Sequence, residues 1–383
     1  MVCHVTAPNN GVREKVSGMR PLFNVKPARH RKLFFGLILC LASSAAPALE
    51  LLRWHPPFSY AGEAHIFDYT PPEKATRPWN LCIVFPHIKD AYWQAVNYGM
   101  IDEAGRLGVA LRISEAGGYP NIERQRKLIG DCADSPAVDA IILGTVSFDG
   151  LSDTVRRASL RKPVLATVND IADAGLSAKV GVPYYEMGRL AGRYLVQRYP
   201  DTSQSIAVAW FPGPRKAGWV PFVDGGFRDA IRGSAIRVVA VAWGDTDKTV
   251  QRNLVQDALD RHPDIAVLAG NAMMAEAAIG ILRERGLEEK VSIVATYLTP
   301  GVYRGIARRK VLAAPTDSPV VQGRLSIDQA VALLERKRFE KHMGPVIRVV
   351  DRDHLEGIQA EDALPPPTFL PQFRFDPVPT TPR

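Results

Sequence analysis

The sequence predicts an α/β fold of two doubly wound parallel-sheet lobes that are joined by a hinge. Short apolar runs, such as residues 81–85 (LCIVF), are typical of strands buried on both faces of a parallel sheet. Stretches with apolar residues at helical spacing follow these runs. The strand–helix alternation occurs in two consecutive series, and the pieces after the second series can cross between the two sheets.

The first series begins after a Pro-rich, aperiodic N-terminal arm at residues 49–78. Its strands and helices alternate regularly, and Asp90 is a good cap for its first helix. Strands are predicted at residues 81–85, 110–115, 140–143 and 164–168, and helices at 90–107, 122–132 and 150–160. This βαβαβαβ order is typical of a doubly wound sheet.

The second series repeats the pattern. Its strands are predicted at residues 206–211, 238–243, 265–269 and 291–296, and its helices at 187–199, 222–232, 250–261 and 273–285. Later elements are a helix at 302–309, a strand at 311–314, a helix at 322–334, an extended piece at 346–350 and a Pro-rich C-terminal tail at 351–383. We expect an N-terminal lobe of residues 79–172 and 297–314, and a C-terminal lobe of residues 173–296 and 315–350.

Residues 1–48 are predicted to form a signal peptide region. A basic stretch at 29–32 (RHRK) precedes an apolar run at 33–42 (LFFGLILCLA), which is too short to span a bilayer comfortably. Small residues at 46–48 (APA) then match a cleavage site. We expect cleavage immediately before Leu49 and a periplasmic product without direct membrane insertion. The alternative is an uncleaved N-terminal anchor.

The distribution of charge argues against nucleic acid as a partner. The chain has a net charge of +8, but seven basic residues and one acidic residue lie in the first 48, so that region carries +6 of it. The remaining +2 is spread along the rest of the chain. Such a small and dispersed charge does not form the basic surface that binds nucleic-acid phosphates.

Two cysteines remain after the predicted cleavage. Cys82 lies on the first predicted strand, and Cys132 ends the second predicted helix. These positions can be neighbours in a doubly wound sheet, and exported proteins support disulfides. We predict that the two cysteines can pair. The alternative is two separate buried thiols.

Aromatic side chains gather where this class of fold binds ligands, which is beyond the carboxyl ends of the strands. The rings at predicted strand ends or crossovers are Tyr92, Trp93, Tyr119, Tyr184 and Tyr297. Asp90 stands just before the first two rings, either as a charge for the ligand or simply as a helix cap. Alternative roles are a core position for Trp93, a surface position for Tyr92 and an exposed turn for Tyr119.

Searches for catalytic motifs favour a binding protein over an enzyme. The sequence contains no H-E-x-x-H, paired C-x-x-C, P-loop, G-x-G-x-x-G or G-x-S-x-G motif. We therefore expect no catalytic residue, no metal and no cofactor. His87 is interpreted as a hydrogen-bonding loop residue rather than a ligand.

Four groups of segments carry a family resemblance. They are LCIVFPHIKDAYWQAVNYGM, SEAGGYPNIERQ, AIILGTVS with VLATVND, and RNLVQDAL with YLTPGVYRGIARRKVLAAPTD and QGRLSIDQAV. From about residue 79 to 351 the chain resembles the ribose-type periplasmic binding proteins. Within them it resembles the branch that senses trimethylamine N-oxide for a membrane histidine kinase. The resemblance implies a type I periplasmic binding fold, ligand binding by cleft closure, and the periplasmic domain of that sensor kinase as a partner.

The resemblance also implies which residues form the ligand cage. Asp90, Tyr92 and Trp93 in KDAYW match it, as does Tyr119 in GGYPN. Tyr297 in YLTPGVYRG matches it less specifically. Aromatic faces attract a methylated cation, and hydroxyl or indole N–H groups can donate to an oxide oxygen.

The chain departs from the family pattern at two places. Tyr184 in VPYYEMG stands where the trimethylamine N-oxide branch tends to carry tryptophan, and Pro183 and Glu186 beside it also differ from the usual residues. The ligand preference can therefore be shifted to a related methylated amine. Sugar-binding relatives usually carry an Asn-Asp pair where this chain has Asn271 and Ala272. The missing carboxylate weakens the case for a sugar.

Three alternative functions stay open at this point. The chain can be the substrate-binding component of an ABC transporter for a sugar or methylated amine, or an exported α/β enzyme. A sugar-responsive transcription repressor shares the fold but needs a DNA-binding helix-turn-helix before residue 79. The predicted export signal occupies that place.

Overall fold

The computed structural model describes residues 49–201 and 203–377. The predicted signal peptide lies outside the described residues. The first sheet is built from β1 (Leu49–His55), β2 (Glu63–Tyr69), β3 (Asn80–Phe85), β4 (Ala110–Glu115), β5 (Ala140–Leu143), β6 (Val164–Val168), β7 (Ala178–Gly181), β13 (His342–Pro345) and β15 (Arg374–Phe375). Their order across the sheet is β15-β4-β3-β5-β6-β7-β13-β1-β2, and the strands from β4 to β13 in that order run parallel.

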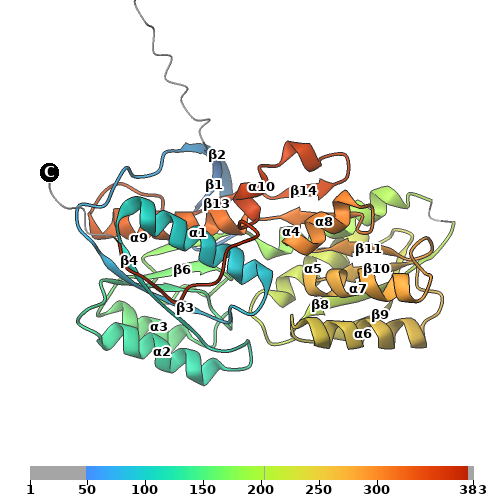
Figure 1. The fold of residues 1–383 in the computed structure, drawn as a ribbon, viewed down its shortest axis with the longest axis horizontal. Coiled ribbons are helices and arrows are strands. Elements are labelled where there is room, and N and C mark those ends of the chain that lie inside the picture. The colour runs from blue at the N-terminus through green and yellow to red at the C-terminus, as the bar shows by residue number, and fades with distance from the viewer. Residues whose placement is uncertain (1–48, 202, 378–383) are drawn as a thin grey trace, which may run out of the picture. The chain divides into compact units, whose positions relative to one another are not determined.

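Helices cover both faces of this first sheet (Figure 1). They are α1 (Ala91–Leu107), α2 (Ile122–Asp134), α3 (Ser152–Ser159) and α9 (Pro319–Leu334). Helices α1 and α9 lie on one face, and α2 and α3 lie on the other. This arrangement explains why residues 81–85 of β3 are all buried and why the strand reads as a continuous apolar run.

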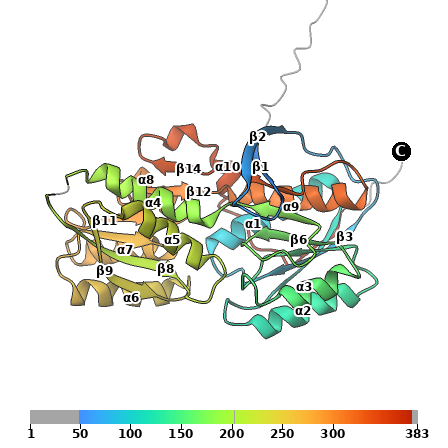
Figure 2. The same cartoon turned by 180° about the vertical axis from the view of Figure 1, so that it is seen from behind.

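The second sheet has the order β14-β12-β11-β10-β8-β9. Its strands are β8 (Ile206–Gly213), β9 (Ile236–Trp243), β10 (Val267–Gly270), β11 (Ser292–Ala295), β12 (Ala313–Thr316) and β14 (Arg348–Asp351). The helices beside it are α4 (Tyr184–Arg198), α5 (Val220–Ile231), α6 (Lys248–Arg261), α7 (Ala272–Glu284) and α8 (Pro300–Ala307), as Figure 2 shows from behind. Both series of predicted strands and helices are therefore confirmed, with small shifts at their ends.

Helices α1 and α9 of the first lobe pack closely against each other. Helices α1 and α9 touch at two glycines, because a Cβ at Gly99 would lie 2.1 Å from the carbonyl oxygen of Val320. A Cβ at Gly323 would lie 2.4 Å from the carbonyl oxygen of Val96. Only glycine permits this approach. The contact holds α9 against the helix whose first turn reaches the candidate site.

The chain crosses between the two sheets at short segments, and these crossings correct the predicted lobe boundaries. Strand β7 belongs to the first sheet, so the first crossing lies at residues 182–183 rather than at 172. Strand β12 pairs with β11 in the second sheet, whereas α9 and β13 return to the first. The expected placement of residues 297–314 and most of 315–350 is thus wrong. Short apolar strands fit the edge of either sheet, and the sequence pattern does not say which.

The predicted irregular arm is also wrong. Residues 49–69 contain the antiparallel hairpin β1–β2, which extends the first sheet beyond β13. The Pro-rich tail contributes β15, which pairs with β4. Both segments lie at sheet edges, where alternation is weak because many side chains are exposed.

The predicted cysteine pair is confirmed. Cys82 of β3 and Cys132 of α2 form a disulfide with their Cα atoms 6.1 Å apart. The bond ties β3, an interior strand of the first sheet, to the helix that follows the Tyr119 loop. Among the described helices, none has the length and apolarity that crossing a membrane requires.

Candidate functional site

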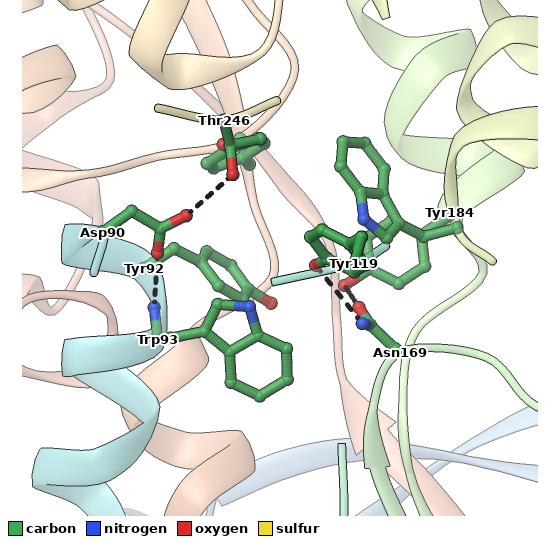
Figure 3. Close-up of a pocket in the computed structure, with 9 residues that line it drawn as sticks. Asp90, Tyr92, Trp93, Tyr119, Asn169, Tyr184 and Thr246 are labelled. Carbon is green, nitrogen blue, oxygen red and sulfur yellow. Dashed lines mark hydrogen bonds between the residues drawn. The ribbon is translucent and has the colours of Figure 1, made fainter. Parts of the chain in front are cut away.

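A small cavity lies between the two lobes, where loops from both sheets meet. Its lining residues are Asp90, Tyr92, Trp93, Tyr119, Asn169, Tyr184, Trp219, Thr246 and Tyr297. All six residues predicted from the sequence are among them (Figure 3). Asn169, Trp219 and Thr246 were missed.

The first lobe supplies residues that follow its strands. Asp90 caps α1 by accepting a hydrogen bond from the backbone N–H of Trp93 at 3.0 Å, which places Tyr92 and Trp93 in the first helical turn. Tyr119 follows Gly117 and Gly118, whose φ angles of 84° and 139° favour glycine. The tight turn after β4 therefore presents the Tyr119 ring to the cavity.

Asn169 reaches the cavity through a strained backbone position. Val168, the last residue of β6, has a φ of 64°, which a β-branched residue rarely adopts. Such outliers cluster at functional sites. Asn169 comes directly after a predicted strand, in the stretch VND, and this position is the signal that could have identified it.

The second lobe supplies the opposite wall. Tyr184 begins α4 just after the first crossing, Trp219 precedes α5, and Tyr297 follows β11. Thr246 lies between β9 and α6. Trp219 and Thr246 follow strands too, but the loop after β8 is long and a threonine gives no distinctive signal.

Aromatic rings from the two lobes face one another edge to face. The ring centroids of Tyr92 and Tyr297 are 5.3 Å apart, and those of Tyr119 and Trp219 are 6.4 Å apart. Within the second lobe, the tilted rings of Tyr184 and Trp219 have centroids 5.8 Å apart. These distances lie within the range of favourable aromatic contacts. Each of these rings is at most 8% exposed, so the walls are dry and apolar.

The enclosed space is small. It has a free radius of roughly 3 Å. In this structure the cavity therefore suits a compact ligand of few heavy atoms.

One side of the cavity is negative. Asp90 is buried, and its second carboxylate oxygen accepts a hydrogen bond from the Thr246 hydroxyl at 3.2 Å. Nearby His87 is buried too, and burial lowers its pKa, so the imidazole is neutral at physiological pH. The carboxylate at this end is thus not matched by a histidinium charge.

The other side carries hydroxyl groups whose protons are fixed by Asn169 (Figure 3). The side-chain amide nitrogen of Asn169 donates to the carbonyl of Thr145 at 2.7 Å and to the hydroxyl oxygen of Tyr119 at 3.3 Å. The amide oxygen is left to accept from the Tyr184 hydroxyl at 3.4 Å. Because Tyr119 accepts from Asn169, its own proton remains available to a ligand.

The Tyr92 hydroxyl is already engaged. It donates to Asp317 at 2.6 Å, and Gln322 donates to the same carboxylate oxygen at 2.9 Å. Burial raises the pKa of Tyr92 and, likewise, those of Tyr119 and Tyr184. These hydroxyls stay protonated at physiological pH, and Tyr119 is the tyrosine among them that has a proton to give.

The predicted hydrogen-bonding role of His87 is wrong. Within the described residues neither of its ring nitrogens has a hydrogen-bond partner. The ring instead packs edge to face on Tyr119, with centroids 5.3 Å apart, and on Trp93 at 6.4 Å. His87 therefore supports the aromatic wall from behind.

The described residues contain no group of three or more His, Cys, Asp or Glu side chains that could hold a metal ion. The site instead combines largely aromatic walls, one carboxylate, and hydroxyl protons on Tyr119 and Tyr297 that no described side chain accepts. Such an arrangement can bind a compact dipolar molecule.

The fold and this inter-lobe cavity define a class of protein. Residues 78–365 match the family described as "Periplasmic binding proteins and sugar binding domain of LacI family". The chain therefore belongs to this family and is a periplasmic protein. It is 39% identical to the periplasmic protein TorT of Escherichia coli K12, over 90% of this chain and 97% of that protein.

Solved structures agree with this assignment. A solute-binding protein from Bradyrhizobium sp. BTAi1, with bound bis-tris, is 46% identical and superposes with a TM-score of 0.74 over 86% of this chain and 98% of the other. The complex of the TorS sensor domain with TorT without ligand is 41% identical, with a TM-score of 0.71 over 77% of this chain and 99% of the other. The same complex with trimethylamine N-oxide has a TM-score of 0.70.

Proposed function

We propose that the protein senses trimethylamine N-oxide, or a closely related methylated amine, in the periplasm. The lobes close around the ligand, and the closed form signals to the periplasmic domain of a TorS-like membrane histidine kinase. The protein has no catalytic activity of its own. The observation that carries the proposal is the dipolar cavity, which has the Asp90 carboxylate on one side and the free Tyr119 proton on the other.

The walls suit the methylated cation. Trimethylamine N-oxide has a positively charged nitrogen under three methyl groups, and ring faces attract such a charge by about 0.5–2 kcal/mol per ring. Tyr92 and Trp93 line one side, and Trp219 lines the other. The Asp90 carboxylate adds attraction because the site is shielded from water.

The Tyr119 end suits the oxide oxygen. An amine oxide oxygen is a strong acceptor, and Tyr119 has a proton to donate because Asn169 already donates to its oxygen. A quaternary ammonium has no acceptor and would leave this donor unpaired. Leaving a buried donor unpaired costs about 1–3 kcal/mol. The cavity is thus expected to distinguish the oxide from other methylated cations.

The size of the ligand limits the affinity. Five heavy atoms contribute at most about 1.5 kcal/mol each, or roughly 7.5 kcal/mol in total. The dissociation constant should therefore be no tighter than about the micromolar range.

Relatives support the choice of ligand and partner. TorT forms a complex with the TorS sensor domain, both without ligand and with trimethylamine N-oxide. The Bradyrhizobium relative holds bis-tris, which is itself a tertiary amine. In a two-lobed protein, a ligand that contacts both lobes favours the closed form and so alters the surface shown to a partner.

One observation favours a second function. The Bradyrhizobium relative, at 46% identity, is described as a solute-binding protein of an ABC transporter. The cavity would suit transport as well as sensing, because both functions require the lobes to close around a bound ligand. The partner, not the cavity, distinguishes the two functions.

Binding to the cognate sensor domain tests the proposal. The mature protein, immobilised, should retain the periplasmic domain of the TorS-like kinase, and trimethylamine N-oxide should alter the small-angle scattering of that complex. Stimulation of an ABC transporter ATPase, with no binding to the sensor domain, would instead establish the transport function.

A further inference from the structure

Two consecutive residues of each lobe meet across the mouth of the cavity. The Lys89 ammonium pairs with the Asp245 carboxylate at 2.8 Å, and the Thr246 hydroxyl donates to Asp90 at 3.2 Å. Lys89 and Asp90 lie between β3 and α1 of the first lobe, and Asp245 and Thr246 lie between β9 and α6 of the second. We call these four residues the polar latch.

We propose that the Lys89–Asp245 pair of the polar latch determines ligand affinity from outside the cavity by holding the lobes closed. The proposal rests on the function proposed above. Neither residue of the pair lines the cavity, so neither touches the ligand. Both can act only by changing how readily the lobes close.

The pair is placed to report lobe closure. Its partners come from different lobes, so opening the mouth separates the two charges. Their side chains are 34% and 27% exposed, which leaves them open to screening by salt. The neighbouring Asp90–Thr246 hydrogen bond is buried and polar but carries no ion pair. Salt should therefore act on the latch chiefly through Lys89 and Asp245.

Closure and affinity are linked. When only the closed form binds well, the apparent dissociation constant equals the intrinsic one divided by the closed fraction. A partly exposed ion pair changes such an equilibrium by about two- to fivefold. Trimethylamine N-oxide carries no net charge, so its attraction to the protein gives little salt dependence of its own. A salt-dependent affinity for this neutral ligand would therefore indicate that the Lys89–Asp245 pair holds the lobes closed.

The structure offers a matched control. Lys310 and Glu288 also pair at 2.8 Å, with side chains that are 38% and 28% exposed, but both lie in the second lobe. Removing that pair leaves the contact between lobes unchanged. The Lys310→Gln variant thus loses a comparable ion pair without changing closure.

Calorimetric titration with trimethylamine N-oxide tests the proposal in the wild type, Lys89→Gln, Asp245→Asn, the Lys89→Asp/Asp245→Lys charge swap and Lys310→Gln. Raising salt from about 0.01 M to about 1 M shortens the screening length from roughly 30 Å to roughly 3 Å. We expect the affinity of the wild type and of Lys310→Gln for trimethylamine N-oxide to fall about two- to fivefold over this range of salt. Lys89→Gln and Asp245→Asn should already bind trimethylamine N-oxide that weakly at low salt, and their affinity should not change as salt is raised. The charge swap should regain affinity, which a merely local disturbance at Lys89 would not do.

Wild-type affinity in Lys89→Gln at low salt would overturn the proposal, as would undiminished salt dependence in that variant. If no form binds trimethylamine N-oxide, the proposed ligand is wrong, and scattering of the unliganded proteins still tests the latch. Lys89→Gln should then have a larger radius of gyration than the wild type at low salt. Equal radii in that case would refute the latch.

Discussion

Asn169 determines whether the hydroxyls of Tyr119 and Tyr184 can donate a hydrogen bond to a ligand. Its amide nitrogen must face the Thr145 carbonyl, because only a donor can pair with that oxygen at 2.7 Å. The remaining bonds to Tyr119 and Tyr184 then have fixed directions. Sequence reasoning identified Tyr119 and Tyr184 because both rings follow strands or crossings. It could not assign their protons, because these depend on a residue from a different loop.

We expect Tyr119→Phe to weaken binding of trimethylamine N-oxide by about 1–1.5 kcal/mol, the net value of one hydrogen bond. Binding of tetramethylammonium, which has no oxygen, should instead strengthen, because the ring remains and no hydroxyl proton is left unpaired beside this ligand. Calorimetry with both ligands provides the measurement. Tyr98→Phe is a suitable control, since Tyr98 packs against Phe369 away from the cavity. Equal losses for both ligands would argue against a hydrogen bond from Tyr119.

Trp93 serves both the core and the cavity. It is 1% exposed, and its ring lies 5.0 Å from that of Phe85. We expect Trp93→Ala to weaken ligand binding by about 1–3 kcal/mol. The same change should lower the free energy of unfolding by about 3–5 kcal/mol, as for other large buried side chains.

Trp210→Ala separates the two effects. Trp210 is fully buried in β8 and does not line the cavity. This variant should lose comparable stability on chemical denaturation but keep the affinity of the wild type. If Trp93→Ala also kept that affinity, Trp93 would be a core residue only.

At the scale of elements, the sequence predicts strands and helices well where the pattern is strong. The run at residues 81–85 and the cap at Asp90 identify β3 and α1 because burial on both faces of a sheet leaves a clear signature. Strands β7 and β13 are missed because they are four residues long and include buried polar side chains, Lys179 and His342. Both side chains have buried partners that the pattern does not reveal: Lys179 pairs with Asp170, and His342 packs on Trp54 of the N-terminal hairpin.

His342 links β13 to that hairpin. Its ring stacks on Trp54 with centroids 4.6 Å apart, and its Nδ1 accepts a hydrogen bond from the backbone N–H of Phe58 at 3.1 Å. Burial, together with the nearby Lys179 charge, lowers the pKa of His342 to about 2. The folded state therefore holds His342 neutral, whereas the unfolded chain protonates it below about pH 6.5.

We accordingly expect stability to fall as pH decreases from about 6.5, by up to about 1.4 kcal/mol per pH unit from this residue. The unfolded state binds the extra proton in this window, so acid favours unfolding. Urea denaturation between about pH 4.5 and pH 6.5 should show a smaller slope for His342→Gln than for the wild type. His65→Gln, on the exposed strand β2, should keep the wild-type slope. An unchanged slope in His342→Gln would show that this histidine is not responsible.

The disulfide joins β3 to α2, the helix that follows the Tyr119 loop. Cys82 and Cys132 are 50 residues apart in sequence, and closing a loop of this length stabilises by about 4 kcal/mol in the chain-entropy account. We expect Cys82→Ala/Cys132→Ala to lower the free energy of unfolding by about 2–4 kcal/mol. Chemical denaturation of oxidised wild type and double variant decides this. Two free thiols in periplasmic wild-type protein would contradict the bond itself.

At the scale of the whole molecule, the repeated strand–helix order predicts two lobes, and the structure has two sheets. The chain crosses between them at residues 182–183, 317–318 and 346–347, and once more between β14 and β15. The lobes to which the last third of the chain belongs were predicted wrongly. The sequence patterns of β12 and β13 fit either sheet equally well. The position of the cavity could be predicted because parallel strands bring their carboxyl ends together. Its dipolar character could not, because it arises from loops of both lobes.

Calorimetric titration of the mature protein with trimethylamine N-oxide, tetramethylammonium and ribose tests the dipolar cavity most directly. We predict saturable binding of one trimethylamine N-oxide per chain, with a dissociation constant no tighter than about the micromolar range. Tetramethylammonium should bind more weakly because it leaves the Tyr119 proton unpaired, and ribose should not bind because the largely aromatic walls cannot pair its many hydroxyl groups. Binding of ribose, or equal affinity for tetramethylammonium and the oxide, would contradict this account.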